Sequence, residues 1–207
     1  MTIHLRMGLA ALAAVATLAA GGARADDAAK ADSSAQYAPR IFAGHFDAKG
    51  KSYACFARRY DAAHLARHPK QTVKRMTLLV KSELLPEDKI LNYSFTLRFA
   101  FRDRKGTFDS AGDCGHVGPA ENAADRLQLG CGVDCDGGGL SAELVNNDKQ
   151  LRVSMDSIAI WKSKSAADVD DREGFNGGAD DHVFLLDRVD LDACKPLMDD
   201  DDKSASM

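Results

Sequence analysis

Hydrophobic and polar residues alternate most regularly over residues 92–102. Large apolar side chains occupy every second position of this stretch, with polar or small residues between them: Tyr93, Phe95, Leu97, Phe99 and Phe101. Because successive side chains of a β-strand point to opposite faces, this period of two predicts a strand with one apolar face. Such a strand packs against a single core, which favours a two-sheet sandwich or a closed barrel.

Shorter runs with the same period predict further strands. The run at residues 151–155 resumes at Ile158 on the opposite parity, which predicts a bulge near Asp156 and Ser157. Turn-forming residues at 146–148 and 104–106 each separate two runs and predict hairpins. The remaining strands are expected at residues 40–46, 52–60, 72–81, 107–110, 126–130, 140–145 and 182–191.

Roughly nine short strands separated by Gly, Asn and Asp turns indicate an all-β fold, a single antiparallel sandwich or barrel. One short helix is expected, in which Asp61 caps residues 62–67 and Pro69 ends the helix. The alternation does not distinguish a packed barrel interior from a hollow one that holds a ligand.

The first 25 residues have the features of a secretory signal peptide. Arg6 precedes an unbroken apolar run at residues 9–20, and Ala23-Arg24-Ala25 forms a small-x-small cleavage site. The run is shorter than the about 20 residues that cross a bilayer, so a cleaved signal is favoured over a retained anchor. We therefore expect a periplasmic or secreted protein with no transmembrane span after cleavage.

Composition divides the rest of the chain into three parts. Residues 26–36 are small and polar and predict a flexible leader, and residues 37–197 form a single β-rich domain. Residues 198–207 begin with a run of Asp and predict a disordered acidic tail. The whole chain has a net charge of −4, and the signal peptide contains two arginines and no acid, so the mature chain is more acidic still. Nucleic acid is therefore not expected as a partner.

All five cysteines lie after the signal peptide, so an oxidising compartment predicts two disulfides and one free thiol. Cys114, Cys131 and Cys135 lie close together in glycine-rich sequence, and one bridge is expected within this trio. We expect the third member of the trio to pair with Cys194, which leaves Cys55 as a buried free thiol.

A metal site is the alternative interpretation of the same region. Cys114, His116, Cys131 and Cys135 supply four soft ligands, the number that a tetrahedral zinc site requires, and copper is the other metal that such ligands suit. Asp134 and Asp136 resemble a fragment of a calcium loop. A second acidic loop offers further oxygen ligands for calcium: Asp168, Asp170, Asp171, Glu173, Asp180 and Asp181.

Other chemistry is sparse in the sequence. His64 and His68 stand four residues apart, but they lack the flanking Glu of a metalloprotease, so solvated histidines are expected. The sequence contains no G-x-S-x-G elbow, P-loop or dinucleotide fingerprint, and spacing gives no reason to select a nucleophile such as Ser110 or Ser141. No catalytic residue is assigned.

Three stretches resemble small exported proteins of alphaproteobacteria that have no assigned function. They are residues 60–70 (YDAAHLARHPK), residues 112–118 (GDCGHVG) and residues 129–140 (LGCGVDCDGGGL). The resemblance implies a periplasmic location and carries over no catalytic residue.

The leading hypothesis is an exported, non-enzymatic β-domain without a cofactor, which binds a partner protein or a small-molecule ligand or has a structural role. The first alternative is a metal-binding protein that uses zinc, copper or calcium at the residues named above. The second is a hydrolase with an unrecognised site, because a fold does not dictate a function.

Overall fold

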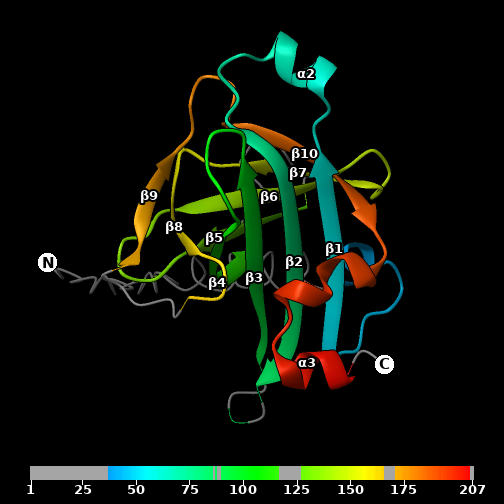
Figure 1. Cartoon of the computed structure of the whole chain (residues 1–207). Coiled ribbons are helices and arrows are strands. Elements are labelled where there is room, and N and C mark those ends of the chain that lie inside the picture. The colour runs from blue at the N-terminus through cyan, green and yellow to red at the C-terminus, as the bar shows by residue number, and fades with distance from the viewer. Residues whose placement is uncertain (1–36, 86, 88–89, 117–126, 166–170, 206–207) are drawn as a thin grey trace, which may run out of the picture.

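A computed structural model describes residues 37–85, 87, 90–116, 127–165 and 171–205. Strands dominate this part of the chain, as the alternation predicts (Figure 1). Ten are present in the described residues: β1 (Lys51–Arg59), β2 (Val73–Leu85), β3 (Ile90–Phe101), β4 (Phe108–His116), β5 (Gln128–Gly132), β6 (Gly139–Val145), β7 (Gln150–Ser154), β8 (Ser157–Lys162), β9 (Glu173–Asn176) and β10 (Val183–Val189).

Eight of these strands close into an antiparallel barrel. The order around it is β3-β2-β1-β10-β7-β6-β5-β4, and pairing of β3 with β4 closes the ring. Strand β8 pairs with the start of β4, where Asp109 stands opposite Trp161, and β9 pairs with β8. The all-β fold that the sequence predicts is therefore a closed barrel and not a two-sheet sandwich.

The barrel interior is filled by side chains. The predicted apolar face of β3 points inward, and Phe95, Leu97 and Phe99 are at most 2% exposed. Facing positions on other strands add Phe56, Leu78, Leu129, Leu151 and Phe184, all buried in the same cluster. Protein interiors pack to the density of organic crystals, so this face is a core.

Two predicted hairpins are confirmed. Asn146, Asn147 and Asp148 adopt positive φ between β6 and β7, and Gly106 does so between β3 and β4. The predicted bulge at Asp156 is wrong, because the chain leaves the barrel there: β7 ends at Ser154, and β8 begins a separate pairing with β9. The change of parity therefore marks the point where the chain passes from barrel strand β7 to strand β8, which lies outside the ring.

The predicted strand at residues 40–46 is also wrong. Residues 37–41 are helical, and Tyr37 and Ile41, which lie one helical turn apart, are fully buried against the barrel. Arg188 of β10 donates to the carbonyl oxygens of Arg40 (3.1 Å) and Ile41 (2.6 Å) at the end of this helix, where backbone carbonyls have fewer intrahelical partners. The apolar spacing here is helical, and the sequence interpretation assigned it to a strand.

The predicted helix is present as α2 (Ala62–Arg67), at the upper end of the barrel in Figure 1. Asp61 caps it by accepting a hydrogen bond from the backbone N–H of His64 at 2.7 Å. The imidazole of His64 stacks between the rings of Tyr60 and His68, with centroids 4.6 and 4.4 Å away. The prediction of two solvated histidines is therefore wrong for His64, which is half-buried, whereas His68 is exposed.

The C-terminal residues pack on the outside of β1 and β2. A 3₁₀ helix, η2 (Leu191–Leu197), is followed by helix α3 (Asp200–Ala205), and together we call them the strap. Leu197 and Met198 pack with Cys55 and Leu79 in a second apolar cluster, separate from the barrel core. The prediction of a disordered tail from residue 198 is therefore wrong for residues 198–205. Contacts with β1 and β2 order this segment, although its run of aspartates alone favours disorder. No helix in the described ranges is long and apolar enough to cross a membrane.

Candidate functional site

The cysteines form two bridges, and one of them is the bridge predicted within the trio. Cys114 of β4 and Cys131 of β5 stand directly opposite each other and are bonded. The second bridge joins Cys55 of β1 to Cys194 of the strap, so the prediction that Cys55 is a free thiol is wrong. Cys55 points outward because its neighbours Ala54 and Phe56 belong to the core, and this orientation turns it towards η2. Cys135 is the free cysteine, and it is exposed.

The glycine-rich turn between β5 and β6 has a structural explanation. A Cβ atom on Gly138 would lie 2.2 Å from the carbonyl oxygen of Ser157, and one on Gly139 would lie 2.2 Å from that of Cys131. Gly138 also has a φ of 69°, which residues with side chains rarely adopt. These glycines therefore let the turn lie against the backbone of β8 and β5.

The soft ligands proposed for a metal do not converge. The sulfurs of Cys114 and Cys131 bond to each other, which removes the thiolates that zinc requires. His116 lies edge-on to the rings of Tyr37 (5.3 Å) and Tyr93 (4.8 Å), and burial lowers its pKa.

The carboxylates proposed for calcium are dispersed as well. Asp134 and Asp136 are exposed on the turn beside Cys135. In the second acidic loop, Glu173 pairs with Arg104, whereas the buried Asp181 accepts hydrogen bonds from the N–H and hydroxyl of Thr72, both at 2.6 Å. Asp180 accepts from the backbone N–H of Lys70 and Asp171 is exposed, while Asp168 and Asp170 lie outside the described residues. Within the described ranges, no three His, Cys, Asp or Glu side chains are grouped for a metal ion.

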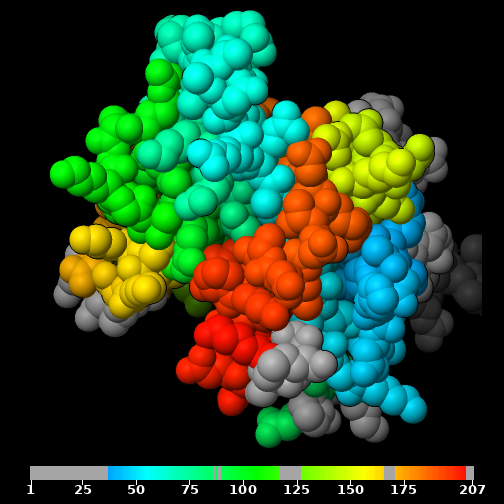
Figure 2. All heavy atoms as spheres, turned by 45° about the vertical axis from the view of Figure 1, so that its right-hand side comes forward, coloured from blue at the N-terminus to red at the C-terminus, as the bar shows by residue number. Residues whose placement is uncertain are grey.

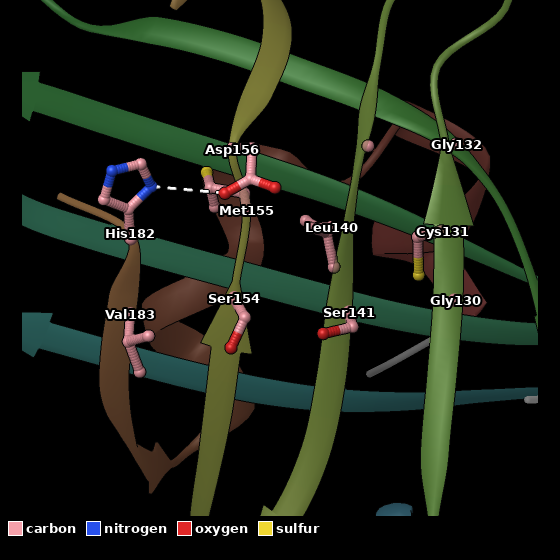
Figure 3. Close-up of a pocket in the computed structure, with 11 residues that line it drawn as sticks. Gly130, Cys131, Gly132, Leu140, Ser141, Ser154, Met155, Asp156, His182 and Val183 are labelled. Atoms are coloured by element: carbon pink, nitrogen blue, oxygen red, sulfur yellow. Dashed lines mark ion pairs between the residues drawn. The ribbon is translucent and has the colours of Figure 1, made fainter. Parts of the chain in front are cut away.

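A shallow depression on the outer face of β5, β6, β7 and β10 brings Ser, His and Asp side chains together (Figure 3). His182 Nδ1 lies 3.3 Å from Asp156, and Ser154 and Ser141 lie nearby on β7 and β6. The second ring nitrogen of His182 points away from both serines in Figure 3, so the set lacks the serine–histidine contact of a catalytic triad. The Asp156 side chain is fully exposed, and such surface ion pairs contribute little.

A larger cleft opens where β1 and β10 separate. Strand β1 pairs with β2 over all nine of its residues but with β10 only from Cys55 to Ala57. Over residues 51–54, one backbone edge of β1 therefore pairs with no strand of the described residues, and it borders the cleft. The cleft has a volume of about 950 Å³, within the range of small-molecule sites. Residues 42–45 and the start of η2 form its other walls.

Cationic and apolar side chains both line this cleft. His45, Lys51 and Arg188 contribute positive or protonatable groups, and Asp190 is the one acidic residue among the described lining residues. The partly exposed apolar residues of the lining are Val189 and Leu191, whereas Phe42 and Ala54 are buried in the barrel core beneath it. The Arg188 guanidinium lies 4.6 Å over the ring of Phe56, and burial lowers its pKa. Because Arg188 also holds the carbonyls of Arg40 and Ile41, its position is rigidly determined.

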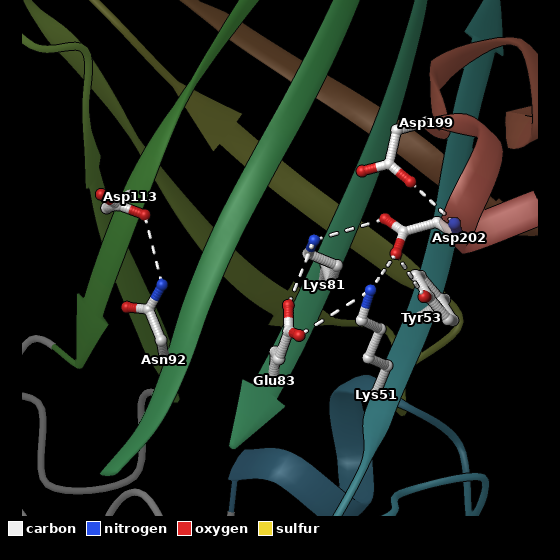
Figure 4. A network of polar contacts seen from close by, with 8 residues as sticks. All are labelled: Lys51, Tyr53, Lys81, Glu83, Asn92, Asp113, Asp199 and Asp202. Carbon is white, nitrogen blue, oxygen red and sulfur yellow. Dashed lines mark hydrogen bonds and ion pairs between the residues drawn. The ribbon is translucent and has the colours of Figure 1, made fainter. Parts of the chain in front are cut away.

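The strap meets the cleft at Lys51 and Tyr53. Both residues line the cleft, and their side chains contact the carboxylate of Asp202, from Lys51 Nζ at 2.7 Å and from the Tyr53 hydroxyl at 2.9 Å (Figure 4). Burial and the hydrogen bond to Asp202 raise the pKa of Tyr53, so the hydroxyl stays a donor. Figure 2 shows the orange and red strap beside the blue and cyan segments that bear this edge of β1.

Sequence reasoning missed these residues. The alternation in β1 places Lys51, Tyr53 and Cys55 on one face, but it does not indicate that the last residues of the chain cover that face. No protein-family model, curated protein or solved structure matches this chain, so the interpretation of the cleft depends on its geometry.

Proposed function

We propose that the protein is an exported binding domain that holds a small organic carboxylate in the cleft between β1 and β10. The observation that carries the proposal is the edge of β1 at residues 51–54, which pairs with no described strand and borders a cleft that Lys51, His45 and Arg188 also line. Backbone N–H groups and cationic side chains are the donors that proteins use to recognise carboxylates. The apolar walls would receive the hydrocarbon part of the ligand.

Export is supported by the signal-like first 25 residues and by the two disulfides, which are typical of oxidising compartments. A reporter that is active only outside the cytoplasm, fused after residue 36, tests this point. Replacement of Leu12 by Arg in the apolar run should abolish the reporter's activity, whereas replacement of Ser33 by Arg should not. Activity that survives L12R would contradict export through this segment.

A titration of the protein with succinate, glutarate and benzoate at constant ionic strength tests the ligand class. We expect saturable shifts of backbone NMR signals at residues 42–45, 51–54 and 188–191. K51M should weaken binding by about tenfold, which corresponds to about 1.4 kcal/mol. The matched control is K74M, because Lys74 is an exposed lysine elsewhere on the barrel. Shifts scattered over the surface, or equal effects of both substitutions, would contradict the proposed site.

A further inference from the structure

Three donors from two strands converge on the carboxylate of Asp202. Lys51 and Tyr53 contribute from β1, and Lys81 Nζ of β2 lies 3.3 Å from the second oxygen (Figure 4). The Asp202 side chain is only 4% exposed, although it belongs to a run of four aspartates. The other three, Asp199, Asp200 and Asp201, are exposed.

Helix α3 depends on this carboxylate for its position. It contains only six residues, and isolated helices of that length are not stable in water. Its described side chains offer no large apolar group for packing. The preceding segment is anchored independently, by the Cys194 bridge and by Leu197 and Met198. Release of Asp202 would therefore free α3 and leave η2 in place.

The donors would remain ordered after such a release. Glu83 of β2 lies 3.7 Å from Lys51 and 3.4 Å from Lys81, so it holds both ammonium groups beside the cleft. With Asp202 gone, two cations and a hydroxyl would face a single remaining carboxylate. This arrangement is suited to receiving another carboxylate.

We propose that Lys51, Tyr53 and Lys81 form a carboxylate-binding cradle that the chain fills with its own Asp202, so that helix α3 competes with a small carboxylate ligand of the adjoining cleft. The inference rests on the proposed function, because Lys51 and Tyr53 also line that cleft. Asp202 is attached to the same chain, so its effective concentration is high and a free ligand has to displace it. By linkage, a ligand that uses the cradle must release α3, and loss of the Asp202 carboxylate must strengthen ligand binding.

The test compares D202A with D201A in the otherwise unaltered protein. Both substitutions remove one aspartate from the same helix, but D202A removes the buried carboxylate that contacts Lys51, Tyr53 and Lys81, whereas D201A removes an exposed one. Hydrogen exchange at residues 200–205 should become at least tenfold faster in D202A and remain unchanged in D201A. Affinity for succinate should rise at least tenfold in D202A alone, and the D202A/K81M double substitution should reverse that gain. D202N, which keeps the shape of the side chain, should behave like D202A.

The results separate this inference from the proposed function. If the wild-type protein binds succinate but D202A neither speeds exchange nor strengthens binding, competition by α3 is wrong and the cleft proposal stands. If D202A speeds exchange but neither the wild type nor D202A binds succinate, glutarate or benzoate, the cleft proposal is wrong. The proposed competition between α3 and a ligand is then wrong as well. Faster exchange together with tighter succinate binding supports both.

Discussion

Lys51 and Asp202 are 151 residues apart in the sequence, and their side chains form an ion pair of 2.7 Å. The contact joins the first strand of the barrel to the last described helix. Because the Asp202 side chain is almost fully buried, solvent screens this pair less than the exposed pairs elsewhere on the surface. The following predictions concern this contact and the other features that hold the chain in place.

Asp202 should make the stability of the protein sensitive to acid. Burial alone would raise the pKa of this carboxyl, but hydrogen bonds from Lys51 and Tyr53 and the charge of Lys81 lower it below its usual value. A lowered pKa in the folded state means that the stabilisation is present above the unfolded value of about 3.9 and is lost as the pH falls through the folded value. D202N should therefore cost about 2 kcal/mol at pH 7 and progressively less below pH 4.

Urea unfolding of the wild type, D202N and D201N between pH 2.5 and 7 measures this difference. D201N serves as the control, because Asp201 is exposed on the same helix. A difference between wild type and D202N that does not change across this pH range would show that the Asp202 carboxylate is not the titrating group.

The two disulfides should contribute unequally to stability. The Cys55–Cys194 bridge spans 139 residues and the Cys114–Cys131 bridge spans 17. In the chain-entropy description, the longer loop stabilises by about 5 kcal/mol and the shorter by about 3 kcal/mol. Paired replacement by Ala, C55A/C194A against C114A/C131A, followed by equilibrium unfolding in urea, tests the order. A larger loss from the shorter loop would indicate that local packing outweighs loop entropy.

Cys135 should be the single thiol that reacts in the native protein. It is exposed, whereas the other four cysteines are paired. A maleimide should add once without denaturant, and C135S should abolish the addition. Mass spectrometry under non-reducing conditions gives the count. Two or more additions to the oxidised native protein would contradict one of the bridges.

Asp181 should be required for stability although it lies in an acidic loop. It is fully buried and accepts from the N–H and hydroxyl of Thr72 and from the N–H of Val73, so it ties this loop to the start of β2. D181A would leave these donors without their acceptor and should cost about 3 kcal/mol. D180A is the matched control and should cost less than about 1 kcal/mol, since Asp180 accepts one backbone hydrogen bond at the surface. Equal midpoints in thermal unfolding would contradict this role.

Local patterns in the sequence predict most of the barrel. The alternation in β3 reports directly on which side chains meet the core, because strand geometry and burial act on the same residues. The same method fails at residues 37–41, where Tyr37 and Ile41 follow a helical spacing too short to stand out. It also fails at Asp156, where the parity of a run does not reveal that the chain leaves the barrel ring and pairs with β4 and β9.

The candidate site is less visible in the sequence, because its parts come together only through long-range closure. Lys51, Lys81 and Asp202 lie in three separate segments, and none has a neighbour that marks it as a ligand-binding residue. The run of aspartates predicts disorder from its average charge. One of the four is nevertheless buried, because the Cys194 bridge and the packing of Leu197 and Met198 hold the strap against β1.

The pairing of β1 with β10 also limits the order in which the parts of the barrel can form during folding. The complete ring also requires pairing of its first strand with its last, at Cys55 and Val189, so it cannot form until nearly the whole domain has been made. Contacts between such distant segments form slowly, because the intervening chain must be ordered first. A chain that is synthesised from its N-terminus therefore lacks a closed barrel until β10 has been made, and the Cys55–Cys194 bridge can form only after that step.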